Sequence, residues 1–230
     1  MTEKILIVRN DRLGDTILAL PTVSLIKEMY PTSEVYFWAN SSLTPLLRFV
    51  RGIDEVISSE NDKSAKLLKM LREWKFSIAY CLNPTSMNAL TMFRASIPKR
   101  VGTARRWYSL AFNKRMNLSR RGGRRHEAIL NLDLVSPDRQ TEEFPFPEIV
   151  IPNQHILDIE SLLLEKLADS RKSLIIVHPG SGLSSVNWHP AYFRKLVEIM
   201  AKNSNVEVVV TGIQSEYELC KEVAGSESIN

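Results

Sequence analysis

Apolar positions along the chain alternate between short continuous runs and stretches with helical spacing. Residues 4–8 contain four consecutive apolar side chains, which is typical of a strand buried on both faces of a sheet. Residues 17–30 have helical spacing instead, with Pro21 early in the stretch and Pro31 at its end. Residues 34–38 form the next β-rich run. This strand–helix–strand order predicts a βαβ unit with a parallel sheet.

The alternation continues to residue 135, where the pattern changes. Further strands are expected at 55–57, 76–82 and 99–102, and further helices at 44–50, 64–74, 86–95 and 126–135. Between residues 136 and 152, four prolines exclude a continuous helix or a central strand: Pro137, Pro145, Pro147 and Pro152. This predicts two domains, residues 1–150 and residues 151–230.

The second domain repeats the α/β pattern over a shorter length. Helices are expected at 154–169, 190–202 and 214–223, and strands at 173–177 and 206–210. A sheet of two parallel strands has unprotected edges and a small core. We therefore expect an incomplete second domain, and a chain that is a truncated product or a fragment.

Composition excludes several classes of protein. With 44% apolar residues among 230, the chain has enough material for a globular core, which excludes a disordered or collagen-like protein. Its two cysteines build neither a disulfide framework nor a four-ligand zinc site, and its four histidines lack metal-motif spacing. Since we find neither an apolar run of about 18 residues nor a signal peptide, we expect a soluble cytoplasmic protein that binds no metal.

The positive charge of the chain is concentrated in one window. The formal net charge is only +4, but residues 94–125 contain eleven basic residues and no acidic one. Elsewhere acidic residues outnumber basic ones, 26 to 19. A field of this kind attracts an anionic partner or surface, although a solvated loop of biased composition is the plainer alternative.

Two loops directly follow buried strands, at the edge where parallel sheets bind their ligands. The first, residues 9–16, places Asp15 close to a helix N-terminus, where it stays ionised and can accept a proton from a hydroxyl. By residue type alone, a helix N-cap is the commoner role for Asp15. Gly14 is expected to let the backbone turn tightly before Asp15. His126, at the start of a later helix, is likewise more often a cap or packing residue than a catalyst.

The second loop, residues 178–185, is rich in glycine and serine and precedes a helix. Its amides and hydroxyls suit phosphate oxygens. It lacks the Gly-Lys-Ser/Thr ending of a Walker A loop, and it does not complete the dinucleotide fingerprint. For a loop of this composition, a flexible connection is therefore as common a role as an anion-binding site.

Several short motifs stand in order along nearly the whole chain. The opening Leu-Gly-Asp-Thr is followed by Pro21, and later come Ile97–Gly102, His126–Ala128 with Asn131-Leu132, His178–Gly182 and Asn187–Pro190. Together they resemble glycosyltransferase family 9, the ADP-heptose:lipopolysaccharide heptosyltransferases.

The resemblance implies a GT-B-like α/β fold, with an N-terminal Rossmann-like parallel sheet that has helices on both faces and a second Rossmann-like domain. It also implies inversion at the anomeric carbon of heptose, with ADP-heptose as the donor and neither metal nor other cofactor. Asp15 matches the proposed base of the family, which deprotonates an acceptor hydroxyl while ADP leaves. The implied donor-binding residues are Gly180, Ser181, Gly182, Thr211, Gly212 and Glu216.

The resemblance also gives the basic window an anionic partner. That partner is a lipid-linked core saccharide at the cytoplasmic face of the inner membrane, so peripheral contact with the membrane is expected. The predicted acceptor-binding residues are Arg12, Gly14, Arg100, Arg105, Arg106 and His126. A nucleic-acid-binding protein is a weaker hypothesis, because the basic window has no recognisable nucleic-acid-binding motif and few aromatic residues.

The sequence departs from the family at two places. Val186 stands where the family usually has a lysine that pairs with a donor phosphate, and the family's later Asp-Thr/Ser-Gly-Pro-x-His segment does not occur before Asn230. Losing one charged phosphate contact costs about 1.5–3 kcal/mol. We therefore expect weak or no transfer by this chain, and the alternative function is a catalytically silent remnant that still binds the acceptor.

Overall fold

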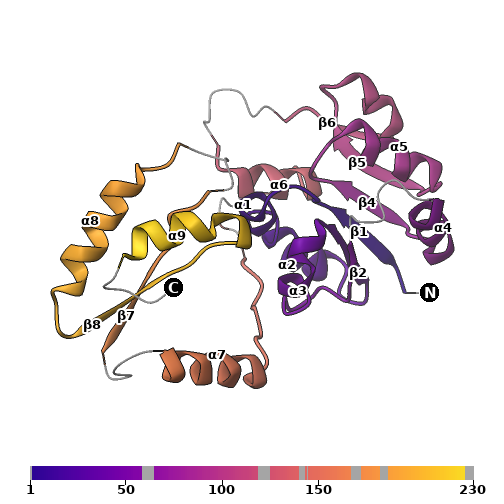
Figure 1. Ribbon diagram of the computed structural model, residues 1–230. Helices are drawn as coiled ribbons and strands as arrows, with labels where there is room; N and C mark the ends of the chain where they lie inside the picture. Colours follow the sequence, from indigo (N-terminus) through magenta and orange to yellow (C-terminus); the bar gives the residue numbers. More distant parts are fainter. Residues whose placement is uncertain are drawn as a thin grey trace. The chain divides into compact units, whose positions relative to one another are not determined.

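The computed structural model describes residues 2–58, 65–118, 125–139, 143, 145–166, 172–181 and 186–225 (Figure 1). The chain divides into two compact units, Met1–Val150 and Ile151–Asn230. Each unit has a parallel sheet and a hydrophobic core of its own. Within the described ranges, no helix combines the length and the apolar character needed to cross a membrane.

A six-stranded parallel sheet forms the centre of the first unit. Its strands, in the order β3-β2-β1-β4-β5-β6 across the sheet, are β1 (Lys4–Val8), β2 (Glu34–Ala39), β3 (Glu55–Ser58), β4 (Ile78–Cys81), β5 (Lys99–Thr103) and β6 (Lys114–Met116). The strand order reverses between β1 and β4. Ligands of open α/β sheets bind at this switch point, outside the carboxyl ends of the strands.

The alternation of side chains along β1 explains why both faces of this sheet are covered. Ile5 and Ile7 belong to one core cluster, Leu6 and Val8 belong to the other, and all four are fully buried. Burying a side chain of this size stabilises the fold by about 1.5–3 kcal/mol. The continuous apolar run at the start of the sequence is therefore a central strand shared by two cores.

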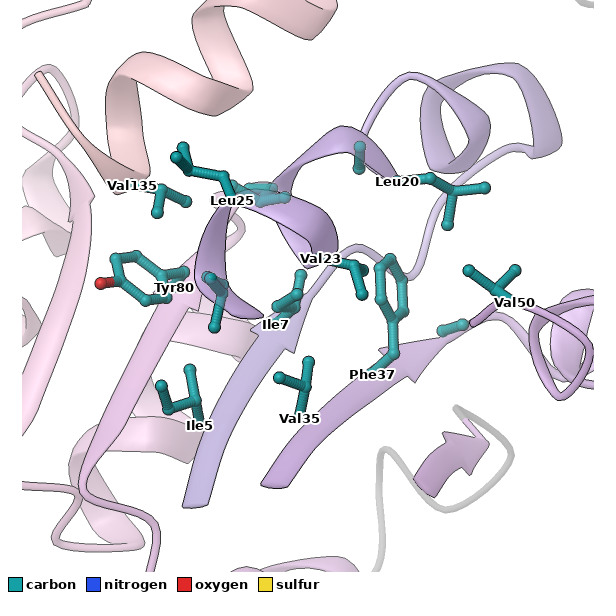
Figure 2. Close-up of a cluster of buried hydrophobic side chains, with 14 of the residues drawn as sticks. Ile5, Ile7, Leu20, Val23, Leu25, Val35, Phe37, Val50, Tyr80 and Val135 are labelled. Carbon is teal, nitrogen blue, oxygen red and sulfur yellow. The ribbon is translucent and has the colours of Figure 1, made fainter. Parts of the chain in front are cut away.

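Helices complete the two cores on opposite faces of the sheet. On the Ile5 face lie α2 (Pro21–Met29) and α6 (Glu127–Val135), and Figure 2 shows side chains of α2 above those of β1 and β2, with Val135 of α6 nearby. The Leu6 face is covered by α4 (Ala65–Trp74), α5 (Ser86–Arg94) and the 3-10 helix η3 (Trp107–Ala111). The smaller elements α1 (Leu13–Ile17), η1 (Ser41–Leu43) and α3 (Thr44–Leu47) connect the first three strands.

The first unit differs from the sequence expectation in the start of one helix and in unexpected elements, among them α1, η3 and β6. The helix expected over 17–30 is α2, which begins only at Pro21, because proline has no N–H to donate and suits the first position of a helix. The short helix α1 lies almost entirely in the stretch 9–16 that was expected to be a loop. Neither η3 nor β6 was expected. β6 pairs with β5 at the edge of the sheet, and Lys114 and Arg115 are exposed, so it has no apolar pattern by which to recognise it.

The second unit contains β7 (Ser173–Val177) and β8 (Val206–Val210), which pair in parallel, and the elements α7 (Asn153–Lys166), α8 (Pro190–Ala201), η4 (Gln214–Glu216) and α9 (Tyr217–Ala224). Its core lies between the strands and the helices α8 and α9. The helix expected over 214–223 is the pair η4 and α9. The α/β class, with a parallel sheet covered on both faces in the first unit, is confirmed.

Candidate functional site

Arg9 is a buried arginine at the carboxyl end of β1, with a side chain that is 5% exposed. Its guanidinium donates to Leu82 O, which follows β4, at 3.0 Å. It also pairs with three carboxylates: Nε with Asp11 at 2.9 Å, Nη2 with Asp15 at 2.9 Å and Nη1 with Glu127 at 3.3 Å. Because the guanidinium is a rigid planar fork, Arg9 fixes acidic side chains from the β1 loop, α1 and α6 around one point.

Asp15 lies in the first turn of α1, where the helix dipole favours a negative charge. The N-cap position belongs to Arg12, so the capping interpretation of Asp15 is wrong. The Asp15 side chain is 39% exposed, with Oδ1 on Arg9, and is therefore accessible to a hydroxyl arriving from solvent. Gly14 lies inside α1 rather than at a turn before Asp15, so that part of the expectation is corrected as well.

The group formed by Arg9 and its three carboxylates has an excess of negative charge. Burial raises the pKa of Asp11 above its ordinary value, Arg9 opposes this effect, and the charge of Asp15 adds to it. Among the residues that the structure describes, no set of three His, Cys, Asp or Glu side chains is placed to hold a metal ion. A carboxylate that is oriented by an arginine and open to solvent, as Asp15 is, can accept a proton.

Three asparagine side chains form a hydrogen-bonded cluster between the ends of β1 and β4. Asn10 donates to Asn88 Oδ1 at 3.1 Å and accepts from Asn83 Nδ2 at 3.0 Å and Asn88 Nδ2 at 2.9 Å. Asn88 is 2% exposed and also donates to Asn83 O at 2.8 Å. The sequence analysis missed this cluster. The available signal was that Asn10 and Asn83 each stand two residues after a buried strand.

Most predicted acceptor residues lie at the same edge of the sheet as Asp15. Arg12 and Gly14 are on or beside the same turn of α1, and both are exposed. His126 caps α6, accepting from Ala128 N at Nδ1, and is adjacent in sequence to Glu127 on Arg9.

Arg105 and Arg106 are exposed and follow the carboxyl end of β5. That strand is two positions from β1, about 10 Å at the usual strand spacing. Both arginines therefore lie at the edge that carries Asp15.

Arg100 is not brought together with this group. It is the second residue of β5, at the amino end of the strand, whereas Asp15 lies beyond the carboxyl end of β1. Its guanidinium donates to Ala111 O at 2.7 Å and to Ile97 O, and it lies 5.3 Å from the ring centre of Phe93. Burial lowers the pKa of Arg100. These contacts give it a structural role between β5, α5 and η3.

In the second unit, predicted donor residues gather at the carboxyl ends of β7 and β8. Gly180 follows β7, Thr211 and Gly212 follow β8, and Glu216 is the last residue of η4. A β-carbon on Gly180 would overlap the Glu216 carboxylate, and one on Gly212 would crowd both Glu216 and Cys220. Glycine at these two positions therefore lets Glu216 approach both strand ends.

A small hollow lies beside these residues. It has a volume of about 240 Å³ and is lined by Val210, Thr211, Gly212, Ile213, Gln214, Tyr217 and Cys220. Glu216 accepts a hydrogen bond from Ile213 N at 3.1 Å, and the His178 ring lies 3.2 Å from Thr211 Oγ1. Ser181 is half-buried next to Gly180, while Gly182 lies outside the described residues. A carboxylate beside a hollow of this size suits hydrogen bonds from sugar hydroxyls.

Comparison with known proteins gives a curated relative and several similar solved structures. No family model matches the chain. A Haemophilus influenzae protein named "Putative glycosyltransferase" is 28% identical over 236 residues, which cover 96% of this chain and 67% of that protein. A crystal structure of glycosyl transferase family 9 from Veillonella parvula matches with a TM-score of 0.84 at 18% identity, over 99% of this chain and 67% of that one. The chain has the fold of glycosyltransferase family 9.

Two E. coli structures share this family 9 fold. ADP-heptose lps heptosyltransferase II matches with a TM-score of 0.81 at 20% identity, over 96% of this chain and 68% of that one. A heptosyltransferase solved with ADP matches with a TM-score of 0.74 at 16% identity, over 97% and 72%. The resemblance found in the sequence motifs and the GT-B-like fold class are therefore confirmed. The curated relative and the similar structures together support a glycosyltransferase of the family 9 kind.

Proposed function

We propose that the chain is an inverting glycosyltransferase that moves heptose from ADP-heptose to an anionic saccharide of the lipopolysaccharide inner core. The observation that carries the proposal is the accessible Asp15 carboxylate, held by buried Arg9 at the switch point of the first sheet. The 28% identity to a glycosyltransferase over 96% of the chain supports the reaction class. Neighbours named for heptosyl transfer, one of them solved with ADP, support the donor.

The proposed reaction begins with proton transfer to Asp15. The carboxylate takes the proton of an acceptor hydroxyl, and the hydroxyl oxygen forms a bond to C1 of heptose on the face opposite the nucleotide. The bond from C1 to the phosphate oxygen breaks, and ADP leaves with the bonding electrons, which inverts the configuration at C1. The exposed side of Asp15 then releases the proton to water.

Other residues of the two units have binding roles in this proposal. In the first unit, Arg12, Gly14, Arg105, Arg106 and His126 meet the anionic acceptor at the edge that carries Asp15. In the second unit, the backbone at Gly180–Gly182 meets donor phosphate, and Glu216 with Thr211 and Gly212 meets the nucleoside. The cytoplasmic face of the inner membrane stays the predicted location.

The test is a transfer assay that follows ADP release from ADP-heptose in the presence of an inner-core acceptor. Asp15→Asn is expected to lower kcat by about 10²- to 10⁴-fold, because the general base is lost. Its affinity for ADP, measured by isothermal titration, should stay unchanged. Asp138→Asn, an exposed acid elsewhere in the first unit, is the matched control and should keep full activity. Equal kcat for Asp15→Asn and wild type would contradict the proposal.

One observation favours a second candidate, a catalytically silent remnant that binds only the acceptor. Val186 stands fully exposed where the family pattern has a phosphate-binding lysine. If the remnant is correct, the acceptor binds while ADP binding stays undetectable. A charged phosphate contact is worth about 1.5–3 kcal/mol, so Val186→Lys should tighten ADP binding about 10- to 100-fold where a donor site exists.

A further inference from the structure

The outer side of α5 and η3 carries large apolar side chains that are open to solvent. Their exposed fractions are 49% for Met87, 42% for Leu90, 54% for Phe93, 74% for Trp107 and 77% for Leu110. We call these five residues the α5–η3 surface. Single exposed apolar residues are ordinary, but a contiguous group of them that includes tryptophan marks an interaction site.

The five side chains lie on two helices that pack against each other, three of them on α5 and two on η3. Met87, Leu90 and Phe93 are three residues apart on α5 and lie along one face, while the opposite face is buried in the core. In a 3-10 helix, side chains three residues apart eclipse each other, which places Trp107 directly beside Leu110 on η3.

α5 and η3 pack against each other along their length. At one end, Tyr108 on η3 donates a hydrogen bond to Pro84 O, just before α5 begins. At the other end, Arg100 donates to Ala111 O at the end of η3 and lies over the ring of Phe93. The two rows of apolar side chains therefore lie on adjacent helices, and we treat them as one surface.

The rim of this surface is strongly basic. Arg94 ends α5, Arg105 and Arg106 precede η3, and Arg115 donates to Phe112 O, which follows η3. No Asp or Glu occurs from residue 74 to residue 126 of the sequence. The apolar group is thus bordered by cations that have no acidic neighbour within the same stretch of chain.

We propose that the α5–η3 surface binds a bilayer of anionic lipid. Trp107, Leu110, Phe93, Leu90 and Met87 enter the boundary between headgroups and acyl chains, and the rim arginines meet lipid phosphates. An aromatic and aliphatic patch inside a basic rim matches this partner in both polarity and charge. A nucleic acid would use the arginines but leaves the aliphatic side chains in water.

Binding in this way has a consequence for the Asp15 edge of the sheet. Arg105 and Arg106 belong both to the rim of the α5–η3 surface and to the edge where Asp15 lies. A membrane-bound first unit would therefore hold that edge close to the headgroups, where a lipid-linked acceptor is found. The inference does not depend on sugar transfer, because lipid binding is measured without donor or acceptor.

The test is co-sedimentation of the full chain with vesicles of phosphatidylglycerol and with vesicles of phosphatidylcholine. Wild type is expected to bind the anionic vesicles at least tenfold more tightly than the neutral ones. Raising the ionic strength from about 0.1 M to about 1 M shortens the screening length from about 10 Å to about 3 Å, and should weaken binding several-fold. The double variant Trp107→Ser/Leu110→Ser should bind at least tenfold more weakly.

The matched control is Trp188→Ser, which removes an exposed tryptophan of the second unit and should bind like wild type. Brominated acyl chains should quench the fluorescence of wild type, and Trp107→Phe should abolish that quenching while binding persists. Unchanged thermal unfolding of the double variant confirms that it is folded. Equal binding by the double variant and wild type would overturn the proposal. Binding of wild type to DNA but not to vesicles would also overturn the proposal. A double substitution that only abolished self-association of the chain, and left vesicle binding unchanged, would overturn it as well.

Discussion

Three carboxylates surround the Arg9 guanidinium at the end of β1, and they come from positions 2, 6 and 118 residues further along the chain. A buried arginine in such a group both stabilises the fold and sets the direction of each acid. The sequence placed Arg9, Asp11 and Asp15 in one loop. It could not show that Glu127 completes the group, because only the packing of α6 on the sheet brings that side chain to β1.

Removing the Arg9 charge should destabilise the first unit. We expect Arg9→Gln to lower the free energy of unfolding by about 3 kcal/mol, because it leaves the carboxylates close together without their counter-charge. This value is at the low end of the loss of stability usual for breaking a buried ion pair, because the carboxylates are 22–39% exposed. The measurement is urea unfolding at neutral pH. Arg12→Gln, which changes an exposed arginine of the same loop, should shift the value by less than about 0.5 kcal/mol, and equal losses for the two variants would contradict the role of Arg9.

The raised pKa of Asp11 gives a pH dependence of stability. An aspartate whose folded pKa lies above its unfolded value stabilises the folded state at low pH, and this contribution is lost as the pH rises through the folded pKa. Asp11→Asn keeps a hydrogen-bond acceptor for Arg9 but cannot ionise. The stability of wild type relative to Asp11→Asn should therefore fall as the pH rises from the ordinary value of 3.8 towards neutrality. Urea unfolding of both proteins at several pH values measures this difference, and a difference that is flat or rises with pH would show that burial does not govern Asp11.

Among the elements, β5 meets η3 through a close contact at a glycine. A β-carbon on Gly102 would overlap the ring of Phe112, which is fully buried in the second core cluster of the first unit. Phe112 follows η3 directly, so this contact helps to seat η3 on the sheet. Gly14 offers the contrast, because a β-carbon there would have nothing within 4 Å and the residue lies in a helix.

The two glycines should respond to alanine with opposite signs. Gly102→Ala is expected to lower the free energy of unfolding by about 1–3 kcal/mol, because the Phe112 ring has to move in a packed core. Gly14→Ala is expected to raise it by up to about 1 kcal/mol, since alanine is the better helix former. Thermal unfolding compares the two variants with wild type. A stable Gly102→Ala protein would mean that the ring has free space beside it.

The elements that could be predicted from the sequence are those whose apolar pattern is complete. β1, β7 and β8 have the expected bounds, because each is a short run of mostly apolar and β-branched residues between polar loops. β6 could not be predicted, because Lys114 and Arg115 are exposed on an edge strand and show no period. Residue type alone favoured a cap role for Asp15, and the sequence could not show that its side chain pairs with the buried Arg9 instead.

At the scale of the whole molecule, the two units have cores of very different size. The first unit has two clusters on either side of six strands, while the second has one cluster between two strands and two helices. On β7, Leu174 and Ile176 are 39% and 63% exposed, so the face of the strand away from that cluster contributes little burial. A smaller core leaves less free energy to oppose local opening.

Hydrogen exchange should therefore separate the two units. We expect the amides of β7 and β8 to exchange much faster than those of β1 and β4, which pair at the centre of the larger sheet. Mass spectrometry of peptides from each strand measures the rates in the 230-residue chain. Equal protection in the two sheets would show that the second unit gains stability from something other than its own core.

Each unit also contains one free cysteine in its core, Cys81 in β4 and Cys220 in α9. Burial raises the pKa of both thiols, so neither reacts readily while its surroundings stay closed. A thiol reagent can therefore label Cys81 only when the first unit opens, whereas Cys220 lines the hollow beside β8 and is 6% exposed. The two labelling rates thus report on the core of the first unit and on the hollow of the second, without any label introduced by mutation.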